Sequence, residues 1–153
     1  MSMTRDQFIA TCDELVKLVR VEFGLTQDAM AHAIGLSKKT LVDIEKGRRS
    51  LGWSGSVVLC SVFQDSDVIS SRFGGVPTEV ILALAFAGKV FRRRTVRGSR
   101  LWWTPIIENE RFSIQQNVIS QHYRLIGKDQ TRIASAFSVD ELLPIFNNPS
   151  EGA

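Results

Sequence analysis

Apolar residues recur at steps of three and four along the first half of the chain, which predicts a series of short amphipathic helices. Residues that cap helices stand at the ends of these stretches, with Thr26 and Ser37 at predicted starts and Gly24, Gly35 and Gly47 at predicted ends. The N-terminal part is therefore expected to be an all-α bundle. Its predicted helices are Gln7 to Phe23, the segment between Thr26 and Gly35, the segment between Ser37 and Gly47, and Trp53 to Phe63.

A segment rich in helix breakers follows this bundle, from Asp65-Ser66-Asp67 to Ser70-Ser71-Arg72-Phe73-Gly74-Gly75. We place a domain boundary there, with an N-terminal domain of residues 1–72 and a C-terminal domain of residues 73–153. Pro77 suits the first turn of a strongly apolar helix, Thr78 to Ala87, which we expect to be buried between the two halves.

The hydrophobic period then changes from a helical to a strand period. Three stretches rich in β-branched and aromatic residues predict an antiparallel β-meander: Leu101 to Ile107, Arg111 to Ile126, and Thr131 to Phe137. The middle stretch shifts phase between Val118 and Ile119, which favours a bulged strand, or alternatively a helix with Ile114, Val118 and Leu125 on one face.

A capping box, Ser138 to Glu141, opens a last short helix that Pro144 should kink or shorten. The predicted fold class is thus α+β: a helical N-terminal domain, and then a small C-terminal domain with an apolar helix, a meander and a terminal helix. In the meander, Trp102 and Trp103 should point to opposite faces of their strand, with at least one of them in the core. The polar residues at 115–117 and 121–123 suit an exposed recognition face, or simply a solvated one.

Composition narrows the function classes. The 153 residues are 44% apolar and contain no run of 18 uncharged apolar residues, and the N-terminus reaches Asp6 before any apolar stretch, so we expect a cytoplasmic protein without a membrane span. Cys12 and Cys60 are expected to be buried free thiols. No GxSxG, P-loop, GxGxxG or metal-ligand pattern is present, so we expect no enzyme, no cofactor and no metal site.

Positive charge is clustered. The net charge is +3, with the excess in residues 73–153, and a basic chain points to a polyanionic partner. One cluster comprises Lys38, Lys39, Lys46, Arg48 and Arg49; the other comprises Lys89, Arg92, Arg93, Arg94, Arg97 and Arg100. The second cluster has Arg92, Arg93, Arg94 and Arg97 as its candidate contacts. It fits a second contact with a polyanion such as DNA, a solvated connector, or a docking site for an acidic partner.

Five residues follow one another at the spacing expected of two packed helices joined by a tight turn: Gln27, Ala31, Gly35, Leu41 and Ile44. Ala31 lies where two helices cross, Gly35 supplies the left-handed turn, and Leu41 and Ile44 anchor the second helix. With Gly24-Leu25-Thr26-Gln27, Gly35-Leu36-Ser37 and Ile44-Glu45-Lys46-Gly47-Arg48, the segment from about residue 12 to 64 resembles the helix-turn-helix of phage repressors and Cro proteins, the XRE-like transcriptional regulators. Ser50-Leu51-Gly52 departs from the family, which often has a proline there.

The resemblance implies a lambda-repressor-like domain and assigns roles to individual residues. The helix that starts at Ser37 would enter the major groove and read bases through Lys38, Lys39 and Asp43, while phosphates would be bound by Gln27, Thr40, Lys46, Arg48 and Arg49. Alternatively, one of the two lysines binds a phosphate, and Asp43 is solvated or pairs with Lys39. Glu45 would be structural, with Arg20 as its candidate partner.

The function that these features favour is a sequence-specific transcription regulator, a repressor that binds a palindromic operator on double-stranded DNA as a homodimer. We expect the C-terminal sheet to supply the dimer contact, and a small-molecule or protein effector could bind the C-terminal domain. The alternative is an antitoxin-like or adaptor protein whose C-terminal half binds a partner protein.

Overall fold

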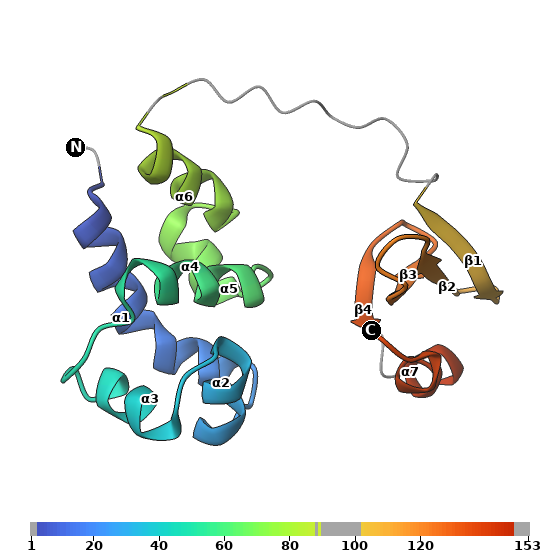
Figure 1. Cartoon of the computed structure of the whole chain (residues 1–153), viewed down its shortest axis with the longest axis horizontal. Coiled ribbons are helices and arrows are strands. Elements are labelled where there is room, and N and C mark those ends of the chain that lie inside the picture. Colours follow the sequence, from blue (N-terminus) through green and yellow to red (C-terminus); the bar gives the residue numbers. More distant parts are fainter. Residues whose placement is uncertain (1–2, 88, 90–101, 149–153) are drawn as a thin grey trace. The chain divides into compact units, whose positions relative to one another are not determined.

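The computed structural model describes residues 3–87, 89 and 102–148 (Figure 1). It consists of two compact units, residues 1–91 and 92–153, each with its own hydrophobic core. The described part of the first unit is helical, and that of the second is a four-stranded antiparallel sheet with a terminal helix. The predicted α+β fold class is therefore confirmed.

The four predicted N-terminal helices are all present, with ends close to those predicted. They are α1 (Arg5–Glu22), α2 (Gln27–Ile34), α3 (Lys38–Glu45) and α4 (Gly52–Val62). The predicted caps explain two of the starts, because Thr26 Oγ1 accepts a hydrogen bond from the Ala29 amide and Ser37 Oγ accepts one from the Thr40 amide. Gly35 ends α2 with φ 75°, a left-handed conformation in which a side chain would be strained.

The breaker-rich segment contains a helix that the sequence analysis missed, α5 (Asp67–Phe73). Ser66 caps its start and Gly74 ends it with φ 75°, so the residues that suggested a boundary are the caps of one more helix. Helix α6 (Pro77–Phe86) then packs against α4 and α5. The first unit therefore extends to residue 91 rather than ending at residue 72.

The core of the first unit lies between α1 and the shorter helices. Fully buried members include Phe8, Val16, Met30, Leu41 and Leu59. The expectation of a buried α6 is met only in part, because Val80, Ile81 and Leu84 are partly buried against this core while Pro77 is its one buried residue.

Cys12 on α1 and Cys60 on α4 are buried free cysteines with their Sγ atoms 4.0 Å apart, as the sequence analysis expected. The hydrogen bond to Cys60, together with burial, raises the pKa of Cys12. Because both side chains are buried, the two thiols pack as small apolar members of the core.

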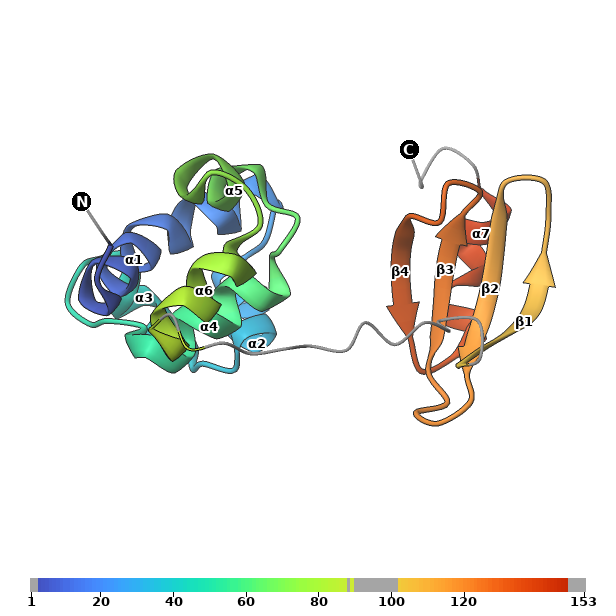
Figure 2. The ribbon, with the colours of Figure 1, turned by 90° about the horizontal axis from the view of Figure 1, so that it is seen from above.

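The second unit contains the predicted meander, with strand order β1-β2-β3-β4 and every neighbouring pair antiparallel. The strands are β1 (Trp103–Glu108), β2 (Phe112–Asn117), β3 (Tyr123–Gly127) and β4 (Arg132–Ala136). A 3-10 turn, η2 (Val139–Glu141), leads into α7 (Leu143–Asn147), which lies against one face of the sheet (Figure 2). The core on that face includes Phe112, Ile114, Leu125, Leu142 and Phe146.

The predicted middle strand is in fact two strands, so both the bulge and the helix suggested for it are wrong. The phase shift at Val118 and Ile119 is a hairpin turn between β2 and β3. Asn117 Oδ1 accepts hydrogen bonds from the amides of Ile119 and Ser120, and Gln121 adopts φ 58°. These contacts replace the glycine that a tight turn usually contains.

The expectation that Trp102 or Trp103 belongs to the core is also wrong. Trp102 is 44% exposed. Trp103 is half-buried, but it is not part of the core that packs against α7. Ile114 on β2 faces the core, so Asn117, three residues further along the strand, faces the other way. Trp103 pairs with Asn117 and therefore lies on the face that points away from α7.

No single helix of the described residues is long and apolar enough to cross a membrane. The bent pair α5 and α6 meets the length and composition requirement only when the two helices are taken together. Both helices contribute side chains to the core of the first unit, among them Ile69, Val80 and Leu84.

Replacing a core leucine tests the packing of the first unit. Leu59→Ala is expected to lower the free energy of unfolding by about 2–5 kcal/mol, because the fully buried Leu59 leaves a cavity when truncated. Urea denaturation followed by circular dichroism at 222 nm measures this change. Leu18→Ala is the control: Leu18 is 55% exposed, and its truncation should change stability by less than about 0.5 kcal/mol. Similar losses in the two variants would refute the proposed core.

Candidate nucleic-acid interface

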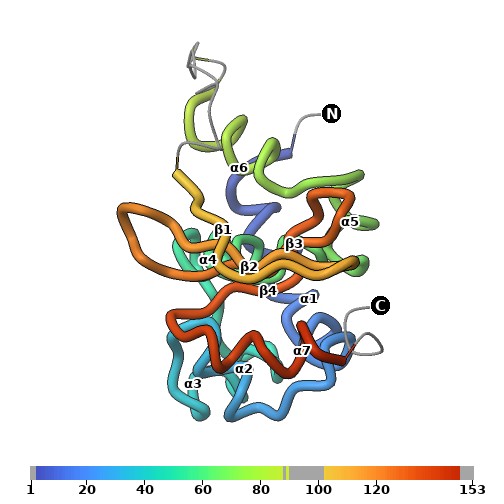
Figure 3. Tube along the Cα trace, turned by 90° about the vertical axis from the view of Figure 1, so that its right-hand side faces the viewer, coloured from blue at the N-terminus to red at the C-terminus, as the bar shows by residue number. Residues whose placement is uncertain are grey.

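Helix α3 has one anchored face and one exposed face. Leu41 and Ile44 are buried in the core of the first unit, while Lys38 and Lys39 in the first turn are exposed. Helices α2 and α3 lie side by side, joined by the turn at Gly35 (Figures 1 and 3). The first turn of α3 is thus presented at the surface by a helix whose opposite side is fixed.

A carboxylate at the end of α3 joins three helices. Glu45 Oε1 accepts a hydrogen bond from Arg20 Nε at 2.5 Å, and Glu45 Oε2 accepts one from Arg20 Nη2 at 3.3 Å and one from Gln27 Nε2 at 2.9 Å. Arg20 also donates to the Leu25 carbonyl oxygen at 3.2 Å. Because Arg20 lies on α1 and Gln27 begins α2, this network connects all three helices, and it confirms Arg20 as the partner of Glu45.

The network is largely shielded from water, with the side chains of Arg20 and Glu45 only 16% and 5% exposed. Burial by itself would raise the pKa of Glu45. The hydrogen bonds from Arg20 and Gln27, and the charges of Arg20 and Lys17, outweigh burial and lower the pKa of Glu45. The carboxylate is therefore ionised at neutral pH, and the network is a charged one.

Six of the predicted contact residues have protein partners in this structure. The Gln27 amide donates to Glu45, Lys38 Nζ lies 3.0 Å from Asp28 Oδ2, and Thr40 Oγ1 accepts from Arg49 Nη1 at 3.2 Å. Asp43 lies 3.8 Å from Arg48, so its ion-pair partner is Arg48 and not Lys39.

In the described part of the first unit, two predicted contact residues are exposed cations without such partners. Within residues 3–87, neither Lys39 nor Lys46 has a hydrogen bond or ion pair through its ammonium group. They lie at opposite ends of α3, Lys39 in its first turn and Lys46 at its C-cap. The predicted contacts Arg92, Arg93, Arg94 and Arg97 lie outside the described residues.

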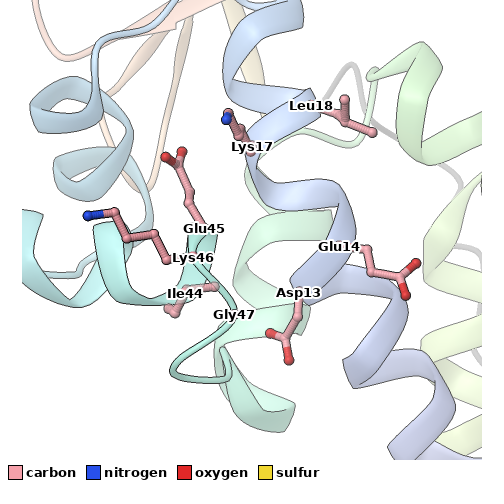
Figure 4. A pocket seen from close by; sticks show the side chains of 8 residues that line it. All are labelled: Asp13, Glu14, Lys17, Leu18, Ile44, Glu45, Lys46 and Gly47. Carbon is pink, nitrogen blue, oxygen red and sulfur yellow. The ribbon is translucent and has the colours of Figure 1, made fainter.

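A pocket of about 520 Å³ lies between α1 and the end of α3 (Figure 4). Glu45 rises from α3 toward the side of α1 that carries Lys17, whereas Lys46 points away from α1. The lining carries both signs of charge and therefore favours neither a strongly anionic nor a strongly cationic ligand. It consists of Asp13, Glu14, Lys17, Leu18, Ile44, Glu45, Lys46 and Gly47.

The second unit has a smaller pocket, of about 300 Å³, lined by Asn109, Glu110, Arg111, Phe112 and Phe146. Across the described part of the chain, no three His, Cys, Asp or Glu side chains are grouped closely enough to hold a metal ion.

The contribution of the carboxylate network to stability should depend on pH. Glu45→Gln is expected to lower the free energy of unfolding by about 1.5–3 kcal/mol at pH 7, because the Arg20 guanidinium loses its ionised acceptor. The lowered pKa of Glu45 means that this stabilisation is fully present above the unfolded-state pKa of about 4.3 and is lost as the pH falls through the folded-state value.

Urea denaturation of the wild type and of Glu45→Gln between pH 3 and pH 7 measures this dependence, and the difference between them should shrink below about pH 4.3. Glu14→Gln is the matched control, since the pair of Glu14 with Arg72 is exposed and should contribute less than about 1 kcal/mol. A difference between wild type and Glu45→Gln that stays constant across this range would contradict the charged network.

Comparison with known families identifies the segment that contains this network. Residues 16–52 match a family model described as helix-turn-helix, and the matched segment includes Arg20, Gln27, Glu45 and all of α3. No curated protein and no solved structure matches the chain. The segment 16–52 is thus an XRE-like helix-turn-helix, and the chain that carries it is a DNA-binding transcription regulator with an unassigned C-terminal unit.

Proposed function

We propose that the protein is a repressor that binds a palindromic operator as a dimer, with α3 in the major groove. The observation that carries this proposal is the arrangement of α3, which is anchored by Leu41 and Ile44 and exposes two lysines in its first turn. In helix-turn-helix proteins the N-terminal residues of the second helix contact base edges, so those lysines are at the required end of the helix.

Lys39 is the proposed principal base reader, because its ammonium group has no partner among the described residues of the first unit. Lysine can donate to guanine O6 and N7, and Asp43 one turn later can accept from cytosine N4, so the half-site should contain G·C pairs. Lys38 is the second proposed reader. The proposed phosphate contacts are Gln27, Thr40, Lys46, Arg48 and Arg49.

The ion pairs in this surface do not oppose DNA binding. The Lys38–Asp28 pair is exposed on both sides, and the Arg48–Asp43 pair is long and exposed at Arg48. Exposed pairs contribute at most about 1 kcal/mol, so phosphates or base edges can replace them at small cost. Gln27 differs from these residues, because one of its amide hydrogens is held by Glu45 and only the other is available to a phosphate.

The effect of Lys39 on specificity is the direct test. Lys39→Ala is expected to weaken binding to a duplex selected from a random library by about 5- to 150-fold, corresponding to about 1–3 kcal/mol, with little change for a scrambled duplex. Electrophoretic mobility shifts at several salt concentrations measure both affinities. Lys128→Ala, which removes an exposed lysine between β3 and β4, is the control. Equal losses on both duplexes would remove Lys39 from base reading.

Failure of the wild type itself to select any sequence would contradict operator binding. It would favour the adaptor function, in which the second unit binds a protein partner.

The dimer makes a separate prediction. A symmetric dimer would place two copies of α3 about 34 Å apart, one helical turn of DNA, and we propose that the sheet of the second unit supplies the contact. Sedimentation equilibrium at micromolar concentration should therefore give twice the chain mass of 17.1 kDa. A monomer at these concentrations would contradict the proposed dimer.

A further inference from the structure

One face of the sheet in the second unit carries a cluster that the helix-turn-helix does not use. Ile114, Leu125 and Ala134 pair across three strands and pack toward η2 and α7. Their neighbours Gln115, Arg124 and Ser135 therefore point to the opposite face. Helix α7 lies on the core side of the sheet (Figure 2), and no described element of this unit packs on the other side.

The Arg124 side chain is held in a fixed position on this face. Its guanidinium lies 3.9 Å from the centroid of the Trp103 ring, a cation–π contact that reaches from β3 to β1. Gln115 on β2, between those strands, accepts hydrogen bonds from Arg124 Nε at 3.0 Å and from Nη2 at 2.8 Å. The cation–π contact and the hydrogen bonds from Arg124 to Gln115 thus hold the guanidinium over the indole in the absence of a ligand.

Among the described residues, Arg124 has no anionic partner. In the part of the second unit that is described, no carboxylate lies within 4.0 Å of Arg124 or Arg132. Burial, and the charge of Arg132, lower the pKa of Arg124. An anion bound beside Arg124 would offset both effects, so this part of the face is complementary to a negatively charged partner. The Glu108 carboxylate, which the register places on the same face, lies at the other end of β1 from Trp103 and accepts a hydrogen bond from Ser113.

Aromatic rings extend the face beside Arg124. The His122 ring stands edge-on to Trp103, with the ring centroids 5.0 Å apart, and Phe137 lies 6.0 Å from His122. Phe137 is 79% exposed, and a phenylalanine ring so exposed offers a planar apolar surface to a partner. The partner that this face fits therefore carries both negative charge and flat rings.

We propose that the face formed by Trp103, Gln115, His122, Arg124 and Phe137, which we term the arginine–aromatic face, binds single-stranded nucleic acid. Its phosphates would lie at Arg124 and at Arg132, which pairs with Ile126, two residues from Arg124 on the same face of β3. Its bases would stack on Phe137 and on the outer side of the guanidinium. Single strands fit better than duplexes because base faces are available for stacking only when they are not already stacked in a helix. This activity is separate from duplex recognition by α3 and does not depend on it. It requires that the proposed dimer contact be made by an edge strand of the sheet, β1 or β4, and leave this face open.

The test uses the full chain and fluorescein-labelled 12-nucleotide single strands, dT12 and U12. Fluorescence anisotropy should show binding of at least one, accompanied by quenching of tryptophan fluorescence. Phe137→Ala and Arg124→Gln should each weaken this binding by about 5- to 150-fold, the equivalent of one lost stacking contact. Phe137 is exposed, so its variant keeps the test valid if Arg124→Gln fails to fold.

The controls separate stacking from charge and from the helix-turn-helix. Arg111→Gln removes the same charge from an exposed residue that directly precedes β2, and Val21→Ala removes an exposed apolar side chain from α1. Neither should change single-strand affinity by more than twofold. Lys39→Ala should also leave it unchanged while weakening selected-duplex binding, so failure of the two proposals can be distinguished.

Three outcomes would overturn the proposal. Equal losses for Arg124→Gln and Arg111→Gln would reduce the binding to general charge attraction. Loss of scrambled-duplex binding in Phe137→Ala to the same extent as single-strand binding would make the face a duplex contact. Tighter binding of a 12-residue polyglutamate than of either oligonucleotide would assign the face to an acidic protein partner.

Discussion

The Glu45 carboxylate is the constraint on which the DNA-binding unit depends. An ionised group that is 5% exposed is costly unless several donors compensate it, and here Arg20 and Gln27 supply three hydrogen bonds. These donors come from α1 and α2, whereas Glu45 ends α3. The charge is satisfied only when the three helices take this one arrangement, so the network specifies the position of α3 as well as stabilising it.

The position of α3 determines what the unit can do. Leu41 and Ile44 bury the inner face of α3, and the hydrogen bonds between Arg20 and Glu45 hold its C-terminal end. The first turn of α3 therefore lies at the surface, where the Lys39 side chain is exposed to solvent. A rigid, basic helix end of this kind suits insertion into the major groove, because little conformational entropy remains to be lost on binding. The buried Glu45 carboxylate thus fixes α3 in the orientation that leaves Lys39 exposed.

The sequence was sufficient where local chemistry fixes structure. Thr26, Gly35 and Ser37 marked helix ends correctly, because caps act within three or four residues. The prediction was wrong where the same residue types occur both in linkers and at helix ends. Ser66 and Gly74 suggested a linker, but they cap α5.

The hairpin turn at residues 118–121 was missed because β-branched residues occupy it, and its stability comes from Asn117. The Arg20–Glu45 pair was predicted only through the family resemblance. The contact of Arg124 with Trp103 depends on the register of three strands, which residue spacing alone does not reveal.

A double-mutant cycle on DNA affinity tests most directly the claim that the Glu45 network positions α3. It uses Arg20→Gln, Glu45→Gln and the combined variant on a library-selected duplex, at a temperature where all of these proteins are folded. If the network positions α3, the effects are strongly non-additive, and the double variant binds no more weakly than the worse single variant. Additive losses, or unchanged affinity in both single variants, would contradict the account.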